Sequence, residues 1–341
     1  MLFQNVFIED IHYLLPESTI SSEQIEKILE GLYKELRLPY GTLESLTGVH
    51  SRRLWPSEKY PSYFSSLVGA KLLKTSQQSA KDIDVLIYAG VCRDFIEPAT
   101  AHKIHHNLNL RKDCLSFDLS NACVGFLSSM LLAAKLIESK QSRSVLVVAG
   151  ENAAPLLENT INHLRSHLSE IAYKAALASL TLGSGAIAIL LTHREQASQK
   201  HRITGAVSQI ASEHYELCQG EGDYRKPLMR TDSPTLLKEG VALSLQTWGD
   251  FLKLMNTSGD SFKHVFTHQV SIPHQERIFA ELKIPLGRSR QDCRNLGNTG
   301  SVAAPLSLAL AEENGSLAVG DKIALLGIGS GLNTVMMGLE W

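Results

Sequence analysis

Residues 115–140 read LSFDLSNACVGFLSSMLLAAKLIESK, and this stretch indicates both the fold class and a candidate nucleophile. A strand-like run over 114–119 turns at 120–122 and continues as a long apolar-periodic helix to about Ser139. The pattern places Cys123 in the first turn of that helix, where unpaired N–H groups and the positive end of the helix dipole favour thiolate over thiol. A lone Cys is more commonly a buried structural residue, so a catalytic role for Cys123 depends on other segments.

Two downstream segments supply the residues that thioester chemistry needs beside a thiolate. In FTHQVSIPHQERI the strand predicted over 264–267 runs into His268 and Gln269, so the imidazole lies at the carboxyl end of a strand, where α/β folds place their chemistry. In LGNTGSVAAPLSLALAEENG, Asn298 lies in a Gly-flanked turn that opens a helix of small residues. The sulfur would carry an acyl group, while the imidazole and the amide would stabilise an oxyanion or enolate on an incoming thioester.

The order and local context of these residues resemble the ketoacyl synthase III branch of the thiolase-fold condensing enzymes. The resemblance covers nearly the whole chain and rests on six segments, namely SLTGVHSRRLW (45–55), NACVGF (121–126), LTLGSGAIAILL (180–191), His268-Gln269, GNTGS (297–301) and GIGSGLN (327–333). It implies that Cys123 carries the acyl group and that His268 and Asn298 polarise the second thioester. It also implies an oxyanion hole formed by the backbone of Cys123 and of the Gly329–Ser330 region.

An internal repeat agrees with the α/β thiolase fold that the resemblance implies, two duplicated βαβ-type halves in a five-layer α-β-α-β-α sandwich. The apolar strands predicted at 84–91 and 144–151 flank the Cys-bearing helix, and those at 264–270 and 322–331 flank the Asn-bearing helix. The predicted boundary lies in the polar stretch between Thr192 and Arg202. We therefore divide the chain into an N-terminal half, 1–195, with the nucleophile, and a C-terminal half, 196–341, with His268 and Asn298.

Composition fits an ordinary cytoplasmic enzyme. The chain has 341 residues, of which 44% are hydrophobic and 20% charged, and a net charge of −2, which favours neither nucleic acid nor an acidic membrane as partner. No apolar run approaches the roughly 20 residues of a membrane span. The five cysteines lack CxxC spacing, so neither a disulfide framework nor a metal site is predicted, and no cofactor is expected beyond the CoA of the thioester substrates.

Several positions depart from the priming ketosynthases and resemble the olefin-pathway branch, which joins two fatty acyl-CoAs head to head. Leu46 and Thr42 stand where the priming enzymes carry the Arg and Trp that clamp the CoA adenine. The segments RRLW (52–55), CRDFIEPATA (92–101), HQVSIPH (268–274) and LLGIGSGLN (325–333) match the olefin branch instead. Leu325 and Leu326 also replace the second catalytic Cys of the degradative thiolases.

Glu97 is the residue that best separates the possible reactions. A loop glutamate is usually a solvated surface carboxylate, but in this family the corresponding loop crosses the dimer interface and lines the partner's acyl pocket. Condensing two unactivated acyl-CoAs requires removal of a proton alpha to a thioester, and a desolvated carboxylate is a suitable base for that step. A malonyl-dependent enzyme makes its carbanion by losing CO₂ and needs no such base.

The sequence therefore predicts an acyltransferase that acts through a Cys123 acyl-enzyme and gives a 2-alkyl-3-ketoacyl product, working as a homodimer. The alternative is a beta-ketoacyl-ACP synthase III that condenses acyl-CoA with malonyl-ACP in fatty acid biosynthesis, and a third is a catalytically silent dimer partner. Chain length, the identity of the second acyl donor, the form in which the product leaves, and an acyl carrier protein or other lipid-pathway enzymes as partners stay open.

Overall fold

The computed structural model describes residues 1–76, 78–198, 201–222 and 224–341. Within them nine strands form one sheet in the order β11-β12-β13-β8-β1-β7-β6-β4-β5. These strands are β1 Val6–Leu14, β4 Val85–Tyr88, β5 Leu115–Asp118, β6 Ser144–Glu151, β7 Gly185–His193, β8 Arg202–Ile210, β11 His264–Thr267, β12 Lys322–Gly329 and β13 Asn333–Glu340. Two small antiparallel pairs join β2 Thr19–Ser21 to β3 Ser51–Arg53, and β9 Cys218–Glu221 to β10 Leu228–Thr231.

The strand order confirms the internal repeat. In the first half β4 pairs parallel with β6, which continues antiparallel through β7 to β1. In the second half β11 pairs parallel with β12, which continues antiparallel through β13 to β8. The halves meet where β1 pairs with β8 at Phe7 and Arg202, so the two predicted sheets are continuous at that edge. Parallel β5 extends only the first half, where it forms the outer edge of the sheet.

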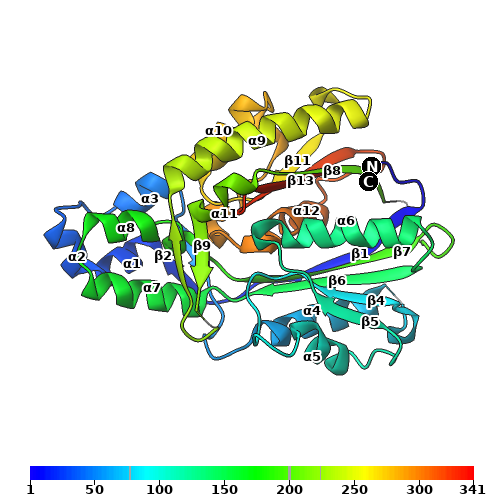
Figure 1. The fold of residues 1–341 in the computed structure, drawn as a ribbon, viewed down its shortest axis with the longest axis horizontal. Helices are drawn as coiled ribbons and strands as arrows, with labels where there is room; N and C mark the ends of the chain where they lie inside the picture. Colours follow the sequence, from blue (N-terminus) through cyan, green and yellow to red (C-terminus); the bar gives the residue numbers. More distant parts are fainter. Residues whose placement is uncertain (77, 199–200, 223) are drawn as a thin grey trace.

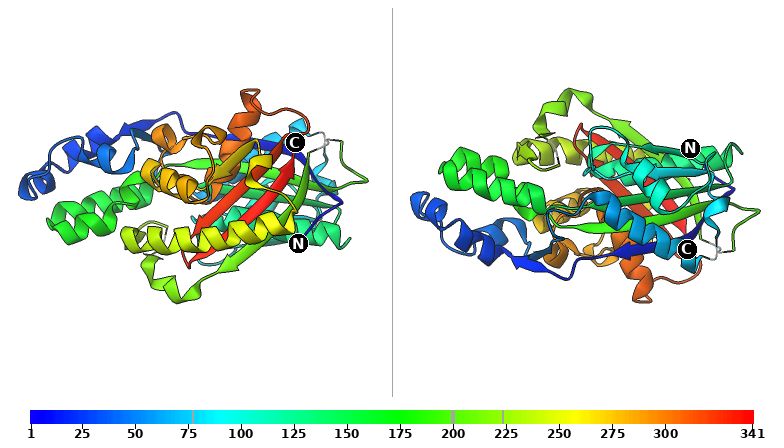
Figure 2. Two further views of the ribbon diagram at one scale, coloured as in Figure 1. Left: turned by 90° about the horizontal axis from the view of Figure 1, so that it is seen from above. Right: turned by 90° about the horizontal axis from the view of Figure 1, so that it is seen from below.

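Helices complete the predicted five-layer arrangement, which is visible in Figure 1 and from two further sides in Figure 2. Helices α6 and α12 lie between the two half-sheets, α4 and α5 cover the outer face of the first, and α9 and α10 cover the outer face of the second. The long helices are α4 Pro61–Thr75, α5 Thr100–Asn107, α6 Gly125–Glu138, α7 Ala154–Ser166, α9 Ser233–Leu254, α10 Ile272–Glu281 and α12 Ala303–Glu313.

Shorter helices make up one end of the molecule and several turns. Helices α1 to α3, α7 and α8 project together at the left of Figure 1 around their own apolar cluster. The short α-helices are α1 Ser22–Ile28, α2 Glu30–Glu35, α3 Thr42–Thr47, α8 Glu170–Ala176 and α11 Cys293–Leu296. The 3₁₀ turns are η1 Ala80–Asp82, η2 Ala122–Val124, η3 Ser179–Thr181, η4 Ser212–Leu217, η5 Gly259–Ser261, η6 Leu286–Arg288 and η7 Gly300–Val302.

The largest apolar core lies in the middle layer, where α6 and α12 pack against the inner faces of both half-sheets. Every residue of β6 and β7 is buried, and so is every residue of β12 after Lys322. This explains why their sequences are continuously apolar instead of alternating, because helices cover both faces of these strands. A rigid, dry core therefore supports the strand ends and helix starts that carry the candidate site.

The predicted division at 195/196 stays a prediction. The polar stretch that suggested it includes residues 199 and 200, which lie outside the described residues, while β7 ends at His193 and β8 begins at Arg202. Within the described part of the chain, no helix is both long and apolar enough to cross a membrane.

Candidate active site

Cys123 lies in the tight turn η2, between the end of β5 and the start of α6. The preceding Ala122 has a φ of 46°, a left-handed conformation that non-glycine residues seldom adopt. Gly125 opens α6 against β4, since a Cβ at this position would lie 2.7 Å from the Ala89 carbonyl oxygen. The close approach of α6 to β4 thus fixes a strained turn that holds the sulfur at a helix start, as the sequence predicted.

The expected thiolate is, however, not the form that the site favours. Desolvation is the largest cause that disfavours a negatively charged sulfur, and the nearby Cys218 and Glu151 add to it. Together they raise the pKa of the Cys123 thiol to about 12. The short 3₁₀ turn before α6 does not outweigh this desolvation. The free enzyme therefore holds Cys123 as a thiol, which corrects the sequence-based expectation.

His268 directly follows β11, where its backbone N–H donates to the Leu326 carbonyl at 3.0 Å. Its side chain is 3% exposed, and neither ring nitrogen makes a hydrogen bond of good geometry among the described residues, although the Gly300 backbone lies close to the ring. Burial, followed by the nearby charge of His274, lowers the pKa of His268 to about 3. The imidazole is therefore neutral at neutral pH and can donate an N–H to a bound carbonyl without carrying a charge.

Asn298 lies in the turn between α11 and η7, and it is 5% exposed. Its backbone N–H donates to Thr181 O at 2.8 Å, and its carbonyl accepts from Gly183 N at 2.9 Å. The side-chain oxygen accepts from Gly300 N at 3.0 Å, which fixes the amide orientation and makes the NH₂ group its donor end.

Glycines let these backbone segments approach one another closely. Gly297 has a φ of 73°, and a Cβ there would lie 2.7 Å from both the Arg52 Cβ and the Thr181 carbonyl oxygen. Arg52 belongs to the 45–55 segment, and Thr181 to the 180–191 segment. The 45–55 and 180–191 segments therefore pack against the turn that carries Asn298.

The predicted oxyanion residues lie beside the nucleophile. Gly329 ends β12, and a Cβ at this glycine would lie 3.4 Å from the backbone nitrogen of Cys123. Ser330 follows in the β12–β13 turn, where its carbonyl accepts from Asn333 Nδ2 at 2.7 Å. Since η2 packs on both η7 and β12, and the Gly300 backbone contacts His268, the segments that carry Cys123, His268 and Asn298 converge.

Glu97 does not join this group within one chain. It lies in the loop between β4 and α5, follows the 86% exposed Ile96, and is itself exposed. The loop is nevertheless firmly anchored, because buried Asp94 accepts from Ser62 N at 2.9 Å and Ser62 Oγ at 2.6 Å. The loop therefore has a fixed base and an exposed tip that carries Glu97.

Three residues near Cys123 or His268 were not predicted from the sequence. Glu151 ends β6, and a carboxylate at the end of an apolar strand is a sequence signal that could have indicated a residue of the site. His274 stands in the quoted HQVSIPH segment, and burial lowers its pKa to about 4. Cys218 reaches the site from the β9–β10 hairpin, a contact for which the sequence carries no periodic or motif signal.

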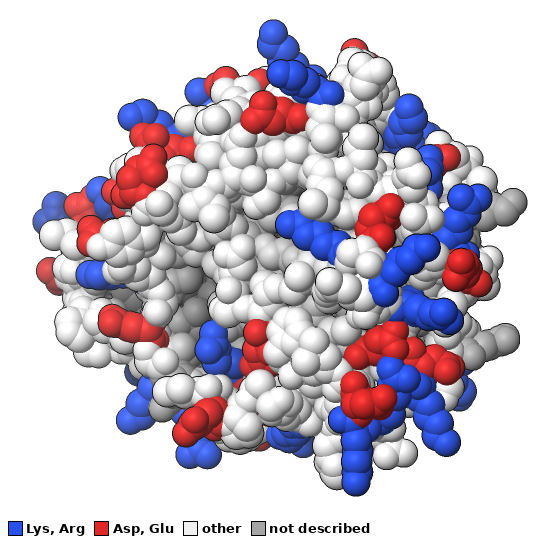
Figure 3. Space-filling view, turned by 45° about the vertical axis from the view of Figure 1, so that its right-hand side comes forward, with Lys and Arg blue, Asp and Glu red and all other residues white. Residues whose placement is uncertain are grey.

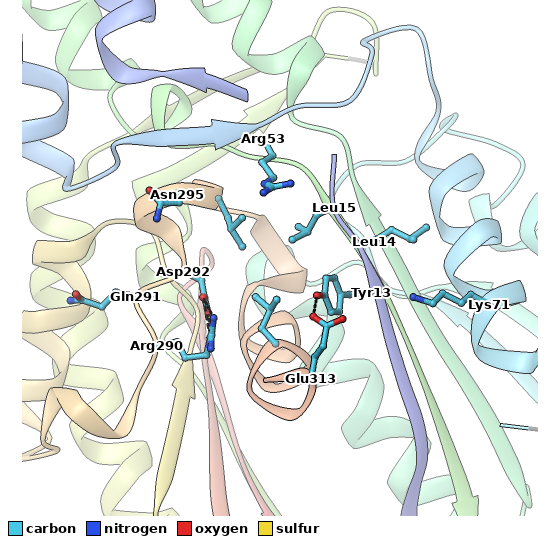
Figure 4. A pocket seen from close by; sticks show the side chains of 12 residues that line it. Tyr13, Leu14, Leu15, Arg53, Lys71, Arg290, Gln291, Asp292, Asn295 and Glu313 are labelled. Atoms are coloured by element: carbon cyan, nitrogen blue, oxygen red, sulfur yellow. Dashed lines mark hydrogen bonds and ion pairs between the residues drawn. The ribbon is translucent and has the colours of Figure 1, made fainter. Parts of the chain in front are cut away.

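A separate crevice of about 540 Å³ lies between the end of β1, α4, α12 and the 290–296 segment (Figure 4). Inside it, the Tyr13 hydroxyl donates to Glu313, and Arg290 pairs with Asp292 at 2.9 Å. Burial and the Glu313 carboxylate raise the pKa of Tyr13 to about 12. Its lining includes none of the residues predicted to be catalytic, so this crevice is distinct from the Cys123 site.

Family models cover much of the chain. One described as 3-oxoacyl-[acyl-carrier-protein (ACP)] synthase III matches residues 117–209, and its C-terminal counterpart matches 252–341. An acyl-CoA:acyl-CoA alkyltransferase of Shewanella oneidensis is 37% identical over 350 residues, with all of both chains covered. One from Xanthomonas campestris is 33% identical over 342 residues, again with all of both chains covered. This chain belongs to the ketoacyl synthase III family.

Solved structures place it in the OleA-type branch of that family. Cerulenin-bound Xanthomonas campestris OleA has a TM-score of 0.96 and 33% identity, over 100% of this chain and 98% of that chain. A Cys-to-Ser variant of the same protein with bound lauric acid and lauroyl-CoA has a TM-score of 0.95 and 32% identity, over all of both chains. A beta-ketoacyl-ACP synthase III of Fusobacterium nucleatum is more distant, at 23% identity over 99% of both chains.

The raised pKa of Cys123 predicts how the free enzyme reacts with iodoacetamide. Because only thiolate reacts, labelling of Cys123 should rise about tenfold per pH unit between pH 7 and 10 without levelling off. Timed quenching and peptide mass spectrometry would measure it, with Cys123→Ser as the control for the labelled peptide. A plateau below pH 8 would show that the resting sulfur is a thiolate after all.

The lowered pKa values of His268 and His274 predict that acid destabilises the fold. His268 and His274 have folded-state pKa values of about 3 and 4 against an ordinary value of 6.5, so the unfolded chain binds more protons between these limits. Their contribution is fully present above pH 6.5 and is lost as the pH falls. Between pH 7 and pH 4, the free energy of unfolding should therefore fall by about 3 kcal/mol less in His274→Gln than in the unmodified protein. Urea unfolding at several pH values would test this, and parallel pH curves would contradict it.

Proposed function

We propose that the protein joins two fatty acyl-CoA molecules by Claisen condensation, giving a 2-alkyl-3-ketoacyl product. The observation that carries the proposal is Glu97, a carboxylate at the exposed tip of a firmly anchored loop in a chain with the Cys, His and Asn of a condensing enzyme. The relatives at 37% and 33% identity are named acyl-CoA:acyl-CoA alkyltransferases, and a related structure holds lauroyl-CoA. Both facts support acyl-CoA as the substrate class.

In the first stage the Cys123 sulfur attacks the thioester carbonyl of an acyl-CoA. A new sulfur–carbon bond forms, the bond to CoA breaks, and the thiol proton leaves with the CoA thiolate. The backbone N–H groups of Cys123 and of the Gly329–Ser330 region then stabilise the oxyanion, a role that the close approach of Gly329 to the Cys123 nitrogen supports. The high resting pKa of Cys123 means that proton removal accompanies attack and does not precede it.

In the second stage another acyl-CoA binds with its carbonyl between His268 and Asn298. Glu97 of the partner subunit removes the alpha proton, and the two donors stabilise the resulting enolate. Neutral His268 suits this role, because its N–H donates without presenting a charge that burial would penalise. The carbanion then attacks the Cys123 thioester, and the sulfur leaves as the new carbon–carbon bond forms.

A homodimer is part of this proposal. Glu97 is exposed in a single chain, and Phe95 and Ile96 beside it are 42% and 86% exposed. Strand β5 forms the sheet edge, and its last residue, Asp118, accepts from the backbone N–H groups of Thr100 and Ala101 just after the Glu97 loop. An anchored apolar tip beside an unpaired strand edge is suited to a second copy of the chain.

The face drawn in Figure 3 carries charges of both signs. In Figure 3, positive and negative side chains are interspersed around a face whose middle is mostly uncharged. A cytoplasmic location, a role in fatty acid or olefin biosynthesis, the lack of a bound cofactor, and other pathway partners stay predictions.

Replacing Glu97 separates this function from malonyl-dependent synthesis. Glu97→Gln keeps the shape of the side chain but cannot accept a proton. With myristoyl-CoA alone it should therefore release about one CoA per site and stop, whereas the unmodified enzyme turns over. Thiol release and product mass spectrometry would follow both steps. If the unmodified enzyme condenses only when malonyl thioester is added, and Glu97→Gln does so equally well, the malonyl-dependent alternative is correct.

Mixed dimers test whether Glu97 acts across the interface. Cys123→Ala lacks the nucleophile and Glu97→Gln lacks the base, so each variant alone should be inactive in condensation. After unfolding and refolding together, random pairing should restore about a quarter of normal activity, because half of the dimers then hold one complete site. Absence of recovery, with mixed dimers verified by distinct affinity tags, would place Glu97 in the site of its own chain.

A further inference from the structure

Glu151 is a buried carboxylate that connects two parts of the site. It ends β6, is 3% exposed, and accepts four hydrogen bonds from main-chain and side-chain groups. Its Oε1 accepts from Val91 N at 2.8 Å, Ser301 Oγ at 2.5 Å and Ser301 N at 3.3 Å. Its Oε2 accepts from Cys92 N at 3.0 Å. Three N–H groups and one hydroxyl therefore stabilise the carboxylate charge. Among the described residues, no Lys or Arg forms an ion pair with Glu151.

The donors come from two functionally different segments. Val91 and Cys92 begin the loop that carries Glu97 at its tip, and Ser301 follows Asn298 in the turn that opens α12. The fit at Ser301 depends on Gly300, where a Cβ would lie 3.3 Å from both Cδ and Oε1 of Glu151. One side chain therefore ties the base of the Glu97 loop to the Asn298 turn.

We propose that Glu151 is a positioning residue that holds the Glu97 loop and the Asn298 turn in a fixed relation, and thereby serves both sites of the dimer. The inference rests on the proposed function, in which Asn298 acts in the site of its own chain and Glu97 in the site of the partner subunit. A displacement of either segment is transmitted through Glu151 to the other. Hydrogen bonds to an ionised carboxylate are short and strong, which makes this tie stiff.

The first test compares condensation with acylation. Glu151→Gln replaces one acceptor oxygen by an NH₂ group that faces the Cys92 N–H, so condensation should fall about 10- to 100-fold, while the CoA burst from Cys123 acylation is largely kept. Glu9→Gln is the matched control, because Glu9 is 4% exposed and also accepts from a Ser amide and hydroxyl, those of Ser198, far from the site. Ser301→Ala removes only the hydroxyl bond and is the milder variant if Glu151→Gln unfolds.

A second readout separates positioning from general loss of structure. Because the Glu151 charge contributes to the raised pKa of Cys123, Glu151→Gln should move the pH profile of Cys123 alkylation to lower pH. Ser301→Ala keeps the charge and should leave that profile unchanged. In the double variant the loss of condensation should be close to that of Glu151→Gln alone, since both changes break the same connection.

Mixed dimers then test whether Glu151 supports both the site of its own chain and the site of the partner subunit. In a dimer of one Cys123→Ala chain and one Glu97→Gln chain, Glu151→Gln should lower condensation whether it is placed in the chain that supplies the base or in the chain that supplies the nucleophile. Loss from only one placement, additive losses in the double variant, or condensation within threefold of Glu9→Gln would overturn the inference. Failure of the proposed function appears differently, as an unmodified enzyme that forms no product from acyl-CoA alone.

Discussion

The packing of α6 and α12 back to back between two half-sheets is the constraint on which the rest of the site depends. The halves repeat one another, so β4, β6 and α6 correspond to β11, β12 and α12. Equivalent ends must therefore meet around the middle layer. The start of α6 supplies Cys123 and the start of α12 follows Asn298. The end of β4 leads to the Glu97 loop and the end of β11 to His268, while β6 and β12 end at Glu151 and Gly329. Duplication thus brings together five positions that are distant in sequence, and it anchors the loop that carries Glu97.

Burial sets the chemical state of these groups. The same desolvation that raises the pKa of Cys123 lowers the pKa values of His268 and His274, so all three are neutral at neutral pH. Glu151 is the buried carboxylate that four hydrogen bonds stabilise. The resting site therefore holds a neutral nucleophile and a neutral carbonyl donor beside this one carboxylate.

The sequence predicted the fold well because its signals were local. Apolar runs marked the buried strands, while the turn at 120–122 and the Gly-flanked turn at Asn298 marked the helix starts. What it could not predict depends on contacts between distant segments. The helix-terminus argument for a Cys123 thiolate considered one helix, whereas the desolvation that outweighs it comes from the packing of η7, β12 and β13 on the η2 turn. Cys218 likewise reaches the site only because its hairpin folds over it, and the four bonds of Glu151 required three segments in register.

A protonated nucleophile has a consequence for selectivity. An exposed thiolate would react with any passing electrophile, and its oxidation would end catalysis. Here burial and the Glu151 charge keep Cys123 as a thiol until a thioester carbonyl fills the space beside Gly329, where backbone N–H groups stabilise the oxyanion that attack creates. The same carboxylate that disfavours the free thiolate also fixes the turn of Asn298. Glu151 therefore adds to the restraint of the nucleophile, in which desolvation is the largest cause, and it also organises the second carbonyl site, so loss of its charge alters both.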